Sequence, residues 1–146
     1  MSAKANWQRW IKSSIAKHFD TNKSTLYLQV DGFYRPPTEA SERMELRIDQ
    51  DYDEQSEDQW EVMVYINVLI TTIKTFSDEY KLERNIGIVM DALTKSIQVQ
   101  KYGDDDSYFG CLQRSRDKIT VTNFGCIEKT TDVLQTTVEA DYRLFI

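Results

Sequence analysis

The chain has 146 residues and a formal net charge of −6 at pH 7, with 40% hydrophobic and 29% charged residues. This composition is typical of a soluble globular protein, and the length predicts one domain over residues 1–146. No apolar run approaches the roughly 20 residues of a membrane span, and the start lacks an apolar segment with a small-residue cleavage site. The sequence therefore predicts a cytosolic protein without a membrane partner.

The charge is divided between two regions of the chain. Residues 39–61 contain ten acidic residues and two arginines, whereas residues 1–23 have a net charge of +4. Complementary charged patches could bring copies of the chain together head to tail, because they steer association and fix orientation. Alternatively, both regions are simply solvated surfaces. General affinity for DNA is disfavoured, since an acidic surface repels phosphates.

The first predicted element is an amphipathic helix that Asn6 would cap and that ends at residues 20–22. Its apolar stripe follows helical spacing, and Arg9, Lys12 and Lys17 lie on its other side. The apolar stripe comprises Trp7, Ile11 and Ile15, with Trp10 and Phe19 beside them. The alternation of Leu26, Leu28 and Val30 then predicts a first strand.

A long β-hairpin is predicted over residues 43–71. Residues 43–48 alternate between apolar and charged side chains, which indicates a second strand with one buried face. Residues 49–58 are polar and acidic and contain no glycine, so we expect a mobile loop there. Residues 59–71 form the longest alternating segment, and such a strand is long enough for its start to project beyond a compact core. Its buried face comprises Trp60, Val62, Val64, Ile66, Val68 and Ile70.

After residue 71 the hydrophobic period changes from that of a strand to that of a helix. Ser77 or Asp78 would cap a second helix that extends to Ile97, and Gly87 inside it suggests a close approach to the sheet. We expect this helix to cover the long strand near Ile66 to Ile70. Its predicted apolar stripe comprises Leu82, Ile86, Val89, Met90, Leu93 and Ile97.

The last part of the chain predicts further strands. A turn at residues 103–106 precedes two similar segments, residues 109–112 and 124–127, around a strand-like segment at 118–122. Glycines in such segments mark bulges or bends, so we expect a kinked antiparallel pair. Residues 134–146 form another alternating strand. Together, the elements predict an α+β fold: a mixed, mainly antiparallel sheet with a long projecting β-hairpin, packed against two amphipathic helices.

The sequence offers little for catalysis. His18 is the sole histidine and lies near a helix end, and no nucleophile-elbow or nucleotide-binding pattern is present. Cys111 and Cys126 lack the paired spacing of a zinc site, so we interpret them as buried thiols. We therefore predict no catalytic, cofactor-binding or metal-binding residue, no cofactor and no enzymatic activity.

An alternative hypothesis is a small divalent-metal-dependent enzyme that acts on nucleic acid. The cluster Asp104, Asp105 and Asp106 would hold Mg²⁺ or Ca²⁺ through its oxygen atoms, with Arg114, Arg116 and Lys118 nearby in sequence. The EF-hand spacing is absent, and adjacent aspartates are also typical of a solvated turn. A further alternative is a small protein-binding adaptor.

The order of elements resembles the tail-terminator proteins of long-tailed bacteriophages and the related tail-completion and head-tail joining proteins. The resemblance covers nearly the whole chain, and its closest passages are residues 59–69 and 138–146. An additional strand-like segment near Ile119 and a longer acidic stretch after Pro37 depart from the pattern. The resemblance carries no diagnostic motif.

The resemblance implies a non-enzymatic virion protein that forms a ring, typically a hexamer, in the host cytoplasm during assembly. Such a ring caps the tail tube, contacts head-tail connector proteins in the tail and neck, and lets DNA pass through its lumen. Strand length and charge predict the subunit interface, with Trp60 more important for assembly than for folding. The candidate interface residues are Asp51, Asp53, Glu54, Glu57, Asp58, Trp60, Val62, Arg9, Lys12 and Lys17.

Overall fold

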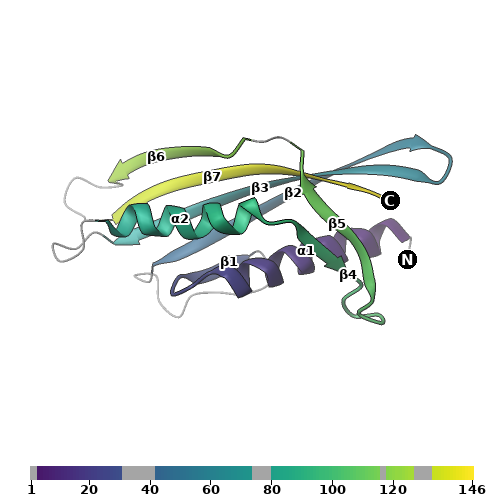
Figure 1. The fold of residues 1–146 in the computed structure, drawn as a ribbon, viewed down its shortest axis with the longest axis horizontal. Coiled ribbons are helices and arrows are strands. Elements are labelled where there is room, and N and C mark those ends of the chain that lie inside the picture. The colour runs from purple at the N-terminus through teal and green to yellow at the C-terminus, as the bar shows by residue number, and fades with distance from the viewer. Residues whose placement is uncertain (1–2, 31–41, 74–79, 116–117, 127–132) are drawn as a thin grey trace.

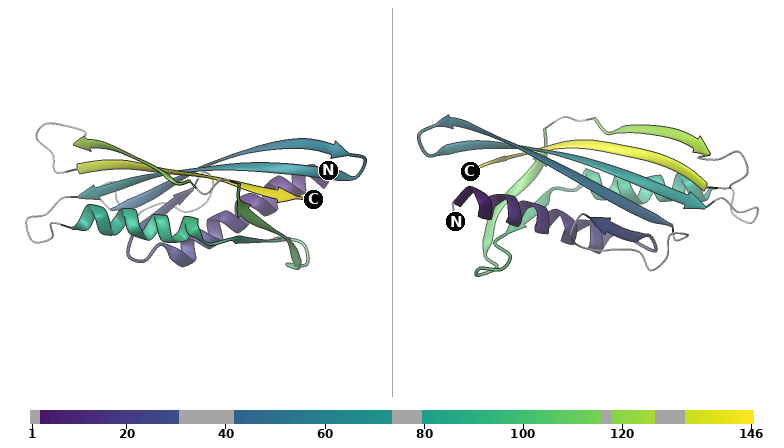
Figure 2. Two further views of the ribbon diagram at one scale, coloured as in Figure 1. Left: turned by 45° about the horizontal axis from the view of Figure 1, so that its top comes forward. Right: turned by 180° about the vertical axis from the view of Figure 1, so that it is seen from behind.

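Two helices pack against one face of a seven-stranded mixed sheet, so the predicted α+β fold class is confirmed (Figure 1). The structure is a computed structural model that describes residues 3–30, 42–73, 80–115, 118–126 and 133–146. Figure 2 shows that both helices, α1 (Ala3–Asn22) and α2 (Lys81–Thr94), lie on the same side of the sheet. We call the opposite side the open face, because no helix of the described residues covers it.

The strand order is β1-β2-β3-β7-β5-β4, and β6 also pairs with β7. The strands are β1 (Tyr27–Val30), β2 (Arg43–Ser56), β3 (Gln59–Ile73), β4 (Ile97–Gln100), β5 (Tyr108–Arg114), β6 (Thr120–Cys126) and β7 (Val133–Phe145). Within the described residues β1 and β2 run parallel, and the remaining pairs are antiparallel. The sheet is thus mixed and mainly antiparallel, as predicted.

β3 is the central strand of the sheet, and its alternation is confirmed. Val62, Val64, Ile66, Val68 and Ile70 are at most 1% exposed and join the core. They point toward the helices because successive side chains of a strand project to opposite faces. α2 packs against both β3 and β7, as we predicted from the apolar stripe.

The prediction of a loop at residues 49–58 is wrong. β2 continues to Ser56, and Glu57 and Asp58 alone form the turn to β3. The strand persists despite its polar sequence because β3 pairs with it in register as far as Glu54 opposite Trp60. The backbone hydrogen bonds of that pairing outweigh the low strand propensity of aspartate.

The hairpin projects less than predicted, because β7 accompanies β3 as far as Phe145 opposite Glu61. Beyond that point, residues 54–59 form the end of the hairpin, which we call the tip. Figures 1 and 2 show the tip beyond the end of β7 and beyond the start of α1.

Both helices differ from their predicted bounds. α1 begins at Ala3, so Asn6 lies inside the helix and does not cap it. Ile97 belongs to β4, and the predicted caps Ser77 and Asp78 lie outside the described residues.

The buried stripe of α2 comprises Asn85, Val89, Ala92 and Leu93. Met90, predicted to lie in the stripe, is 36% exposed. A Cβ at Gly87 would meet no atom within 4 Å, so Gly87 does not mark a close approach to the sheet. The end of α2 is also bonded to β7, since Tyr142 in β7 donates a hydrogen bond to the Leu93 carbonyl.

The predicted pair of kinked strands is also wrong. β5 and β6 do not pair with each other; β6 pairs with β7 near Thr136, and β5 pairs with β7 at Arg143 and Tyr142. The expected irregularities near the glycines are present, since the register shifts between Val99 and Gln100 opposite β5 and between Asn123 and Gly125 in β6.

The turn of the hairpin offers a test of local conformation. Asp58 has a φ of 75°, which glycine adopts at lower cost than other residues. We expect Asp58→Gly to raise the free energy of unfolding by up to about 1 kcal/mol, and Asp58→Val to lower it by about 1–2 kcal/mol. Urea denaturation checks both values. As a control, Glu57→Gly is expected to destabilise, because Glu57 is not in this region and glycine makes the unfolded chain more flexible.

Candidate self-association surface

The acidic residues predicted to form an interface gather at the outer part of the hairpin. Asp51, Asp53, Glu54, Glu57 and Asp58 are all exposed. The stretch between Asp49 and Glu61 contains no lysine or arginine. Among the described residues, none of these five acids forms an ion pair. The outer part of the hairpin, with the tip at its end, therefore presents uncompensated negative charge to solvent.

An aromatic cluster fixes the base of the tip to α1. The Trp7 ring in α1 stacks on Tyr52 at 6.3 Å between ring centroids, and it contacts Trp60 edge-on at 6.2 Å. Gln50 donates a hydrogen bond to the Gln8 carbonyl at 3.3 Å. The backbone of Trp60 also exchanges two hydrogen bonds with Ile146, at 2.9 and 2.8 Å. The hairpin is thus held at its base from two sides.

This cluster changes the interpretation of two predicted interface residues. Val62 is fully buried and faces the core, so it has no surface to offer a second subunit. Trp60 is half-buried because it packs on Trp7 of its own chain. We therefore expect Trp60→Ala to weaken folding as well as any association, contrary to the sequence-based prediction that assembly would lose more.

The basic residues of α1 do not form one open patch. The Arg9 guanidinium lies 3.3 Å from the Asp104 carboxylate of its own chain. Lys12 is half-buried, whereas Lys17 is exposed. An acidic partner would therefore compete with Asp104 for Arg9, which makes this helix face a weaker acceptor than the sequence indicated.

The three adjacent aspartates occupy a turn between β4 and β5, and each has a different setting. Asp104 binds Arg9, and Asp106 donates its backbone N–H to the Lys101 carbonyl at 3.2 Å. The hydroxyl and the backbone N–H of Ser107 both donate to Asp105, which lowers the pKa of that carboxyl. Within the described residues, no group of three histidine, cysteine, aspartate or glutamate side chains is placed to hold a metal ion.

His18 joins α1 to the end of α2. Its Nε2–H donates to the Ala92 carbonyl at 2.9 Å, and its ring packs edge-on against Phe19 at 5.6 Å. Burial lowers the pKa of His18 below its usual 6.5, and the nearby Lys95 charge acts in the same direction, while the hydrogen bond opposes them. His18 is thus a structural residue that favours the neutral ring.

The pKa of His18 predicts a pH dependence of stability. Because the folded-state pKa lies below that of the unfolded chain, the unfolded state binds the proton more readily. The stability contribution is therefore complete above about pH 6.5 and falls as the pH drops through the folded-state pKa. Thermal melting between about pH 7 and pH 5 should show this loss. His18→Gln should flatten the profile, and an unchanged slope would assign the loss to other groups.

A hollow between β5 and β7 was missed by the sequence analysis. It has a volume of about 440 Å³, and Arg114, Arg143, Cys111 and the two exposed rings of Tyr108 and Phe145 line it. Cys111 is half-buried, not fully buried as predicted, whereas the side chain of Cys126 lies outside the described ones. The available signal was Phe145, a large aromatic residue on the polar side of an alternating strand.

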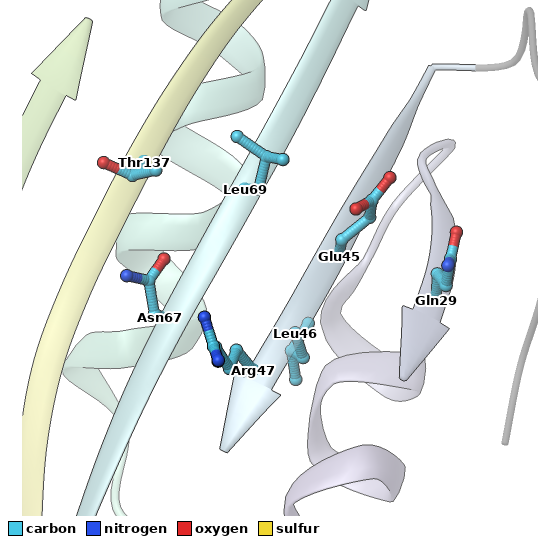
Figure 3. A pocket seen from close by; sticks show the side chains of 7 residues that line it. All are labelled: Gln29, Glu45, Leu46, Arg47, Asn67, Leu69 and Thr137. Atoms are coloured by element: carbon cyan, nitrogen blue, oxygen red, sulfur yellow. The ribbon is translucent and has the colours of Figure 1, made fainter. Parts of the chain in front are cut away.

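The open face carries a second depression, of about 410 Å³. Figure 3 shows its side chains, which come from the adjacent strands β1, β2, β3 and β7. Two of its polar groups have partners in the same chain: Glu45 pairs with Arg43 at 2.6 Å, and Asn67 donates to Glu139 at 2.8 Å. These contacts are internal to the protein and point to no ligand.

Comparisons with known proteins support the fold. The chain matches no protein-family model and no curated protein. A solved structure is similar over 99% of this chain and 96% of that chain, with a TM-score of 0.54 and 10% sequence identity. At this identity the similarity concerns the fold alone. In the described residues no helix is both long and apolar enough to cross a membrane.

Proposed function

We propose that this protein is a non-enzymatic assembly subunit whose copies join head to tail into a closed ring. The class that fits best is the phage tail-terminator and head-tail joining group, whose rings are typically hexamers. In this role the ring forms in the host cytoplasm, caps the tail tube, binds head-tail connector proteins and remains in the virion. Head-to-tail contacts close into rings when the rotation between neighbours allows it.

The tip of the hairpin carries this proposal. It is a hydrogen-bonded, two-stranded element beyond the end of β7, with exposed acids that have no ion-pair partner among the described residues. A preorganised element loses little conformational entropy on binding, so it suits a repeated contact between subunits. Uncompensated charge also favours a partner of opposite sign and disfavours indiscriminate association.

The outer edge of β2 supports the same role. β1 pairs with this edge of β2 over Arg43–Leu46, and beyond that point no strand of the described residues pairs with β2 at the same edge. A free edge invites pairing with any extended chain, and charged side chains are a common protection. Asp49, Asp51 and Asp53 stand along this edge and are exposed. The same acids would repel a DNA duplex that passes through the ring.

No observation favours the alternative of a metal-dependent enzyme, because the aspartates of the β4–β5 turn have different neighbours. The adaptor hypothesis shares the same exposed surfaces. A ring-sized mass in solution would favour the self-assembling subunit, whereas a monomer of 17.2 kDa would fit either an adaptor or an assembly subunit that waits for its partner.

Light scattering of the purified full-length chain over a range of concentrations tests the proposal. We expect a mass that rises to a fixed multiple of 17.2 kDa, six in the case of a hexamer, and ring-shaped particles by electron microscopy. High salt should shift the equilibrium toward smaller species, because it screens the charges. A monomer at every concentration, also in the presence of tail tubes, would contradict the proposal.

A further inference from the structure

Gly110 lines the hollow between β5 and β7, at a point where β5 passes close to Leu144. A Cβ at this position would lie 2.7 Å from Cδ1 of Leu144, closer than such atoms approach. Gly110 therefore lets β5 cross close to the end of β7, with which it pairs at Arg143 and Tyr142. β5 pairs with β4 over Tyr108–Leu112 and then meets β7 at Gln113 and Arg114 (Figure 1). The hollow of about 440 Å³ is lined by residues of β5 and β7.

The rim of the hollow has the composition of a binding hot spot. Tyr108 is 62% exposed and Phe145 is 65% exposed, which is unusual for large aromatic side chains. The Arg143 guanidinium lies 5.4 Å from the centre of the Phe145 ring. Aromatic residues and arginine are enriched where subunits bind, because they combine a large contact area with directed polar groups.

The charge of the hollow is opposite to that of the tip. Arg114 and Arg143 line it, and no acidic side chain of the described residues does. The Arg143 ion pair with Glu61 spans 3.8 Å, so that guanidinium retains donors for another carboxylate. Arg114 forms no ion pair with the described part of the chain. Arginine binds carboxylates in a forked geometry that lysine cannot provide.

The tip of a chain does not line its own hollow: Asp58 and Gln59 lie with Phe145 in a separate pocket. Glu61 pairs with Phe145, and Trp60 exchanges backbone hydrogen bonds with Ile146. These bonds keep the hairpin in line with β7, and the tip extends beyond the end of that strand (Figure 2). An acidic tip that enters the hollow would therefore belong to another copy.

We propose that the hollow between β5 and β7 of one subunit receives the acidic tip of the next subunit, and that Arg114 and Arg143 bind its carboxylates. This acceptor replaces the basic face of α1, where Asp104 already occupies Arg9. The inference rests on the proposed function and adds the residues that join neighbouring copies.

Disulfide cross-linking tests this contact, with Cys111 as the thiol inside the hollow. The full-length chain would carry Glu57→Cys in the tip and Cys126→Ser, so that two cysteines remain. A bond requires about 4.4–6.8 Å between the two Cα atoms, so it reports a real contact. We expect oxidation to give a covalent ladder beyond the dimer on non-reducing gels, and Cys111→Ser to abolish it.

Two further outcomes separate this inference from the proposed function. The first uses a chain with Glu57→Cys, Lys17→Cys and Cys111→Ser. A covalent ladder from this chain would place the acceptor on α1, which overturns the inference but not the proposed ring. Covalent dimers alone, or no cross-link in a chain that light scattering shows to be assembled, would also overturn it. A chain that stays monomeric contradicts the proposed function itself.

A single substitution gives an independent measurement. Phe145→Ala should weaken self-association at least about tenfold and leave the melting temperature nearly unchanged, because the ring is mostly exposed. Tyr27→Ala is the matched control. Tyr27 is 43% exposed on β1, at the opposite edge of the sheet, and its replacement should have no effect on association. Equal effects of the two substitutions on self-association would overturn the assignment of the hollow as the acceptor.

Discussion

Replacement of Ile66 by alanine should lower the free energy of unfolding by about 2–5 kcal/mol. Ile66 is 1% exposed in the middle of β3, between Ile48 of β2 and Ala140 of β7 in the register of the sheet. The loss combines the transfer of buried methyl groups with the cavity that remains. Urea denaturation measures the loss, and an unchanged slope with denaturant would show that the unfolded state is unaffected.

Met63 provides the matched control on the same strand. It lies on the open face and is half-buried, so Met63→Ala should cost about 1 kcal/mol. A loss at Met63 as large as that at Ile66 would contradict the description of this face as open. Repeating the measurement at low protein concentration would then show whether a second subunit covers it.

Neutralising the tip together with the adjacent Asp53 should produce the largest change in association. We expect the combined variant Asp53→Asn, Glu54→Gln, Glu57→Gln and Asp58→Asn to raise the dissociation constant about 100-fold at low salt, because two charge pairs at about 1.4 kcal/mol each would be lost. The hairpin itself should persist, since these side chains are exposed and asparagine tolerates the positive φ of position 58.

Sedimentation velocity at low and high salt checks this prediction. The variant should resemble the unsubstituted chain in high salt and should have lost its own salt dependence. The control neutralises acids elsewhere, Glu83→Gln and Asp91→Asn, on the exposed side of α2. An equal loss of association in this control would indicate that net charge, not the tip, drives assembly.

The buried faces of the strands could be predicted because their signal is local. Alternation in residues 59–71 and 134–146 identified the core side chains of β3 and β7, and the structure confirms them. The prediction for the end of β2 failed for the opposite reason. Its polar sequence looks like a loop, but the pairing with β3 supplies backbone hydrogen bonds that no property of residues 49–56 reveals.

The candidate surface was predictable only in part. The acids of the tip were identified correctly as an exposed cluster, because charge is read directly from the sequence. The ion pair of Arg9 in the basic helix could not be predicted, since its partner Asp104 lies 95 positions away in the sequence. The partial burial of Trp60 could not be predicted either, because it depends on the contact with Trp7.

The sequence by itself thus determined which side of each long strand is buried, the α+β class and the segregation of charge. These properties follow from a two-residue or 3.6-residue period and from composition. The tertiary structure decided which elements are neighbours: it joined β5 and β6 to the same strand, packed α1 under the hairpin and left Phe145 and Tyr108 exposed beside two arginines. Contacts between distant residues depend on how the twisted sheet and the helices pack, so no local period encodes them.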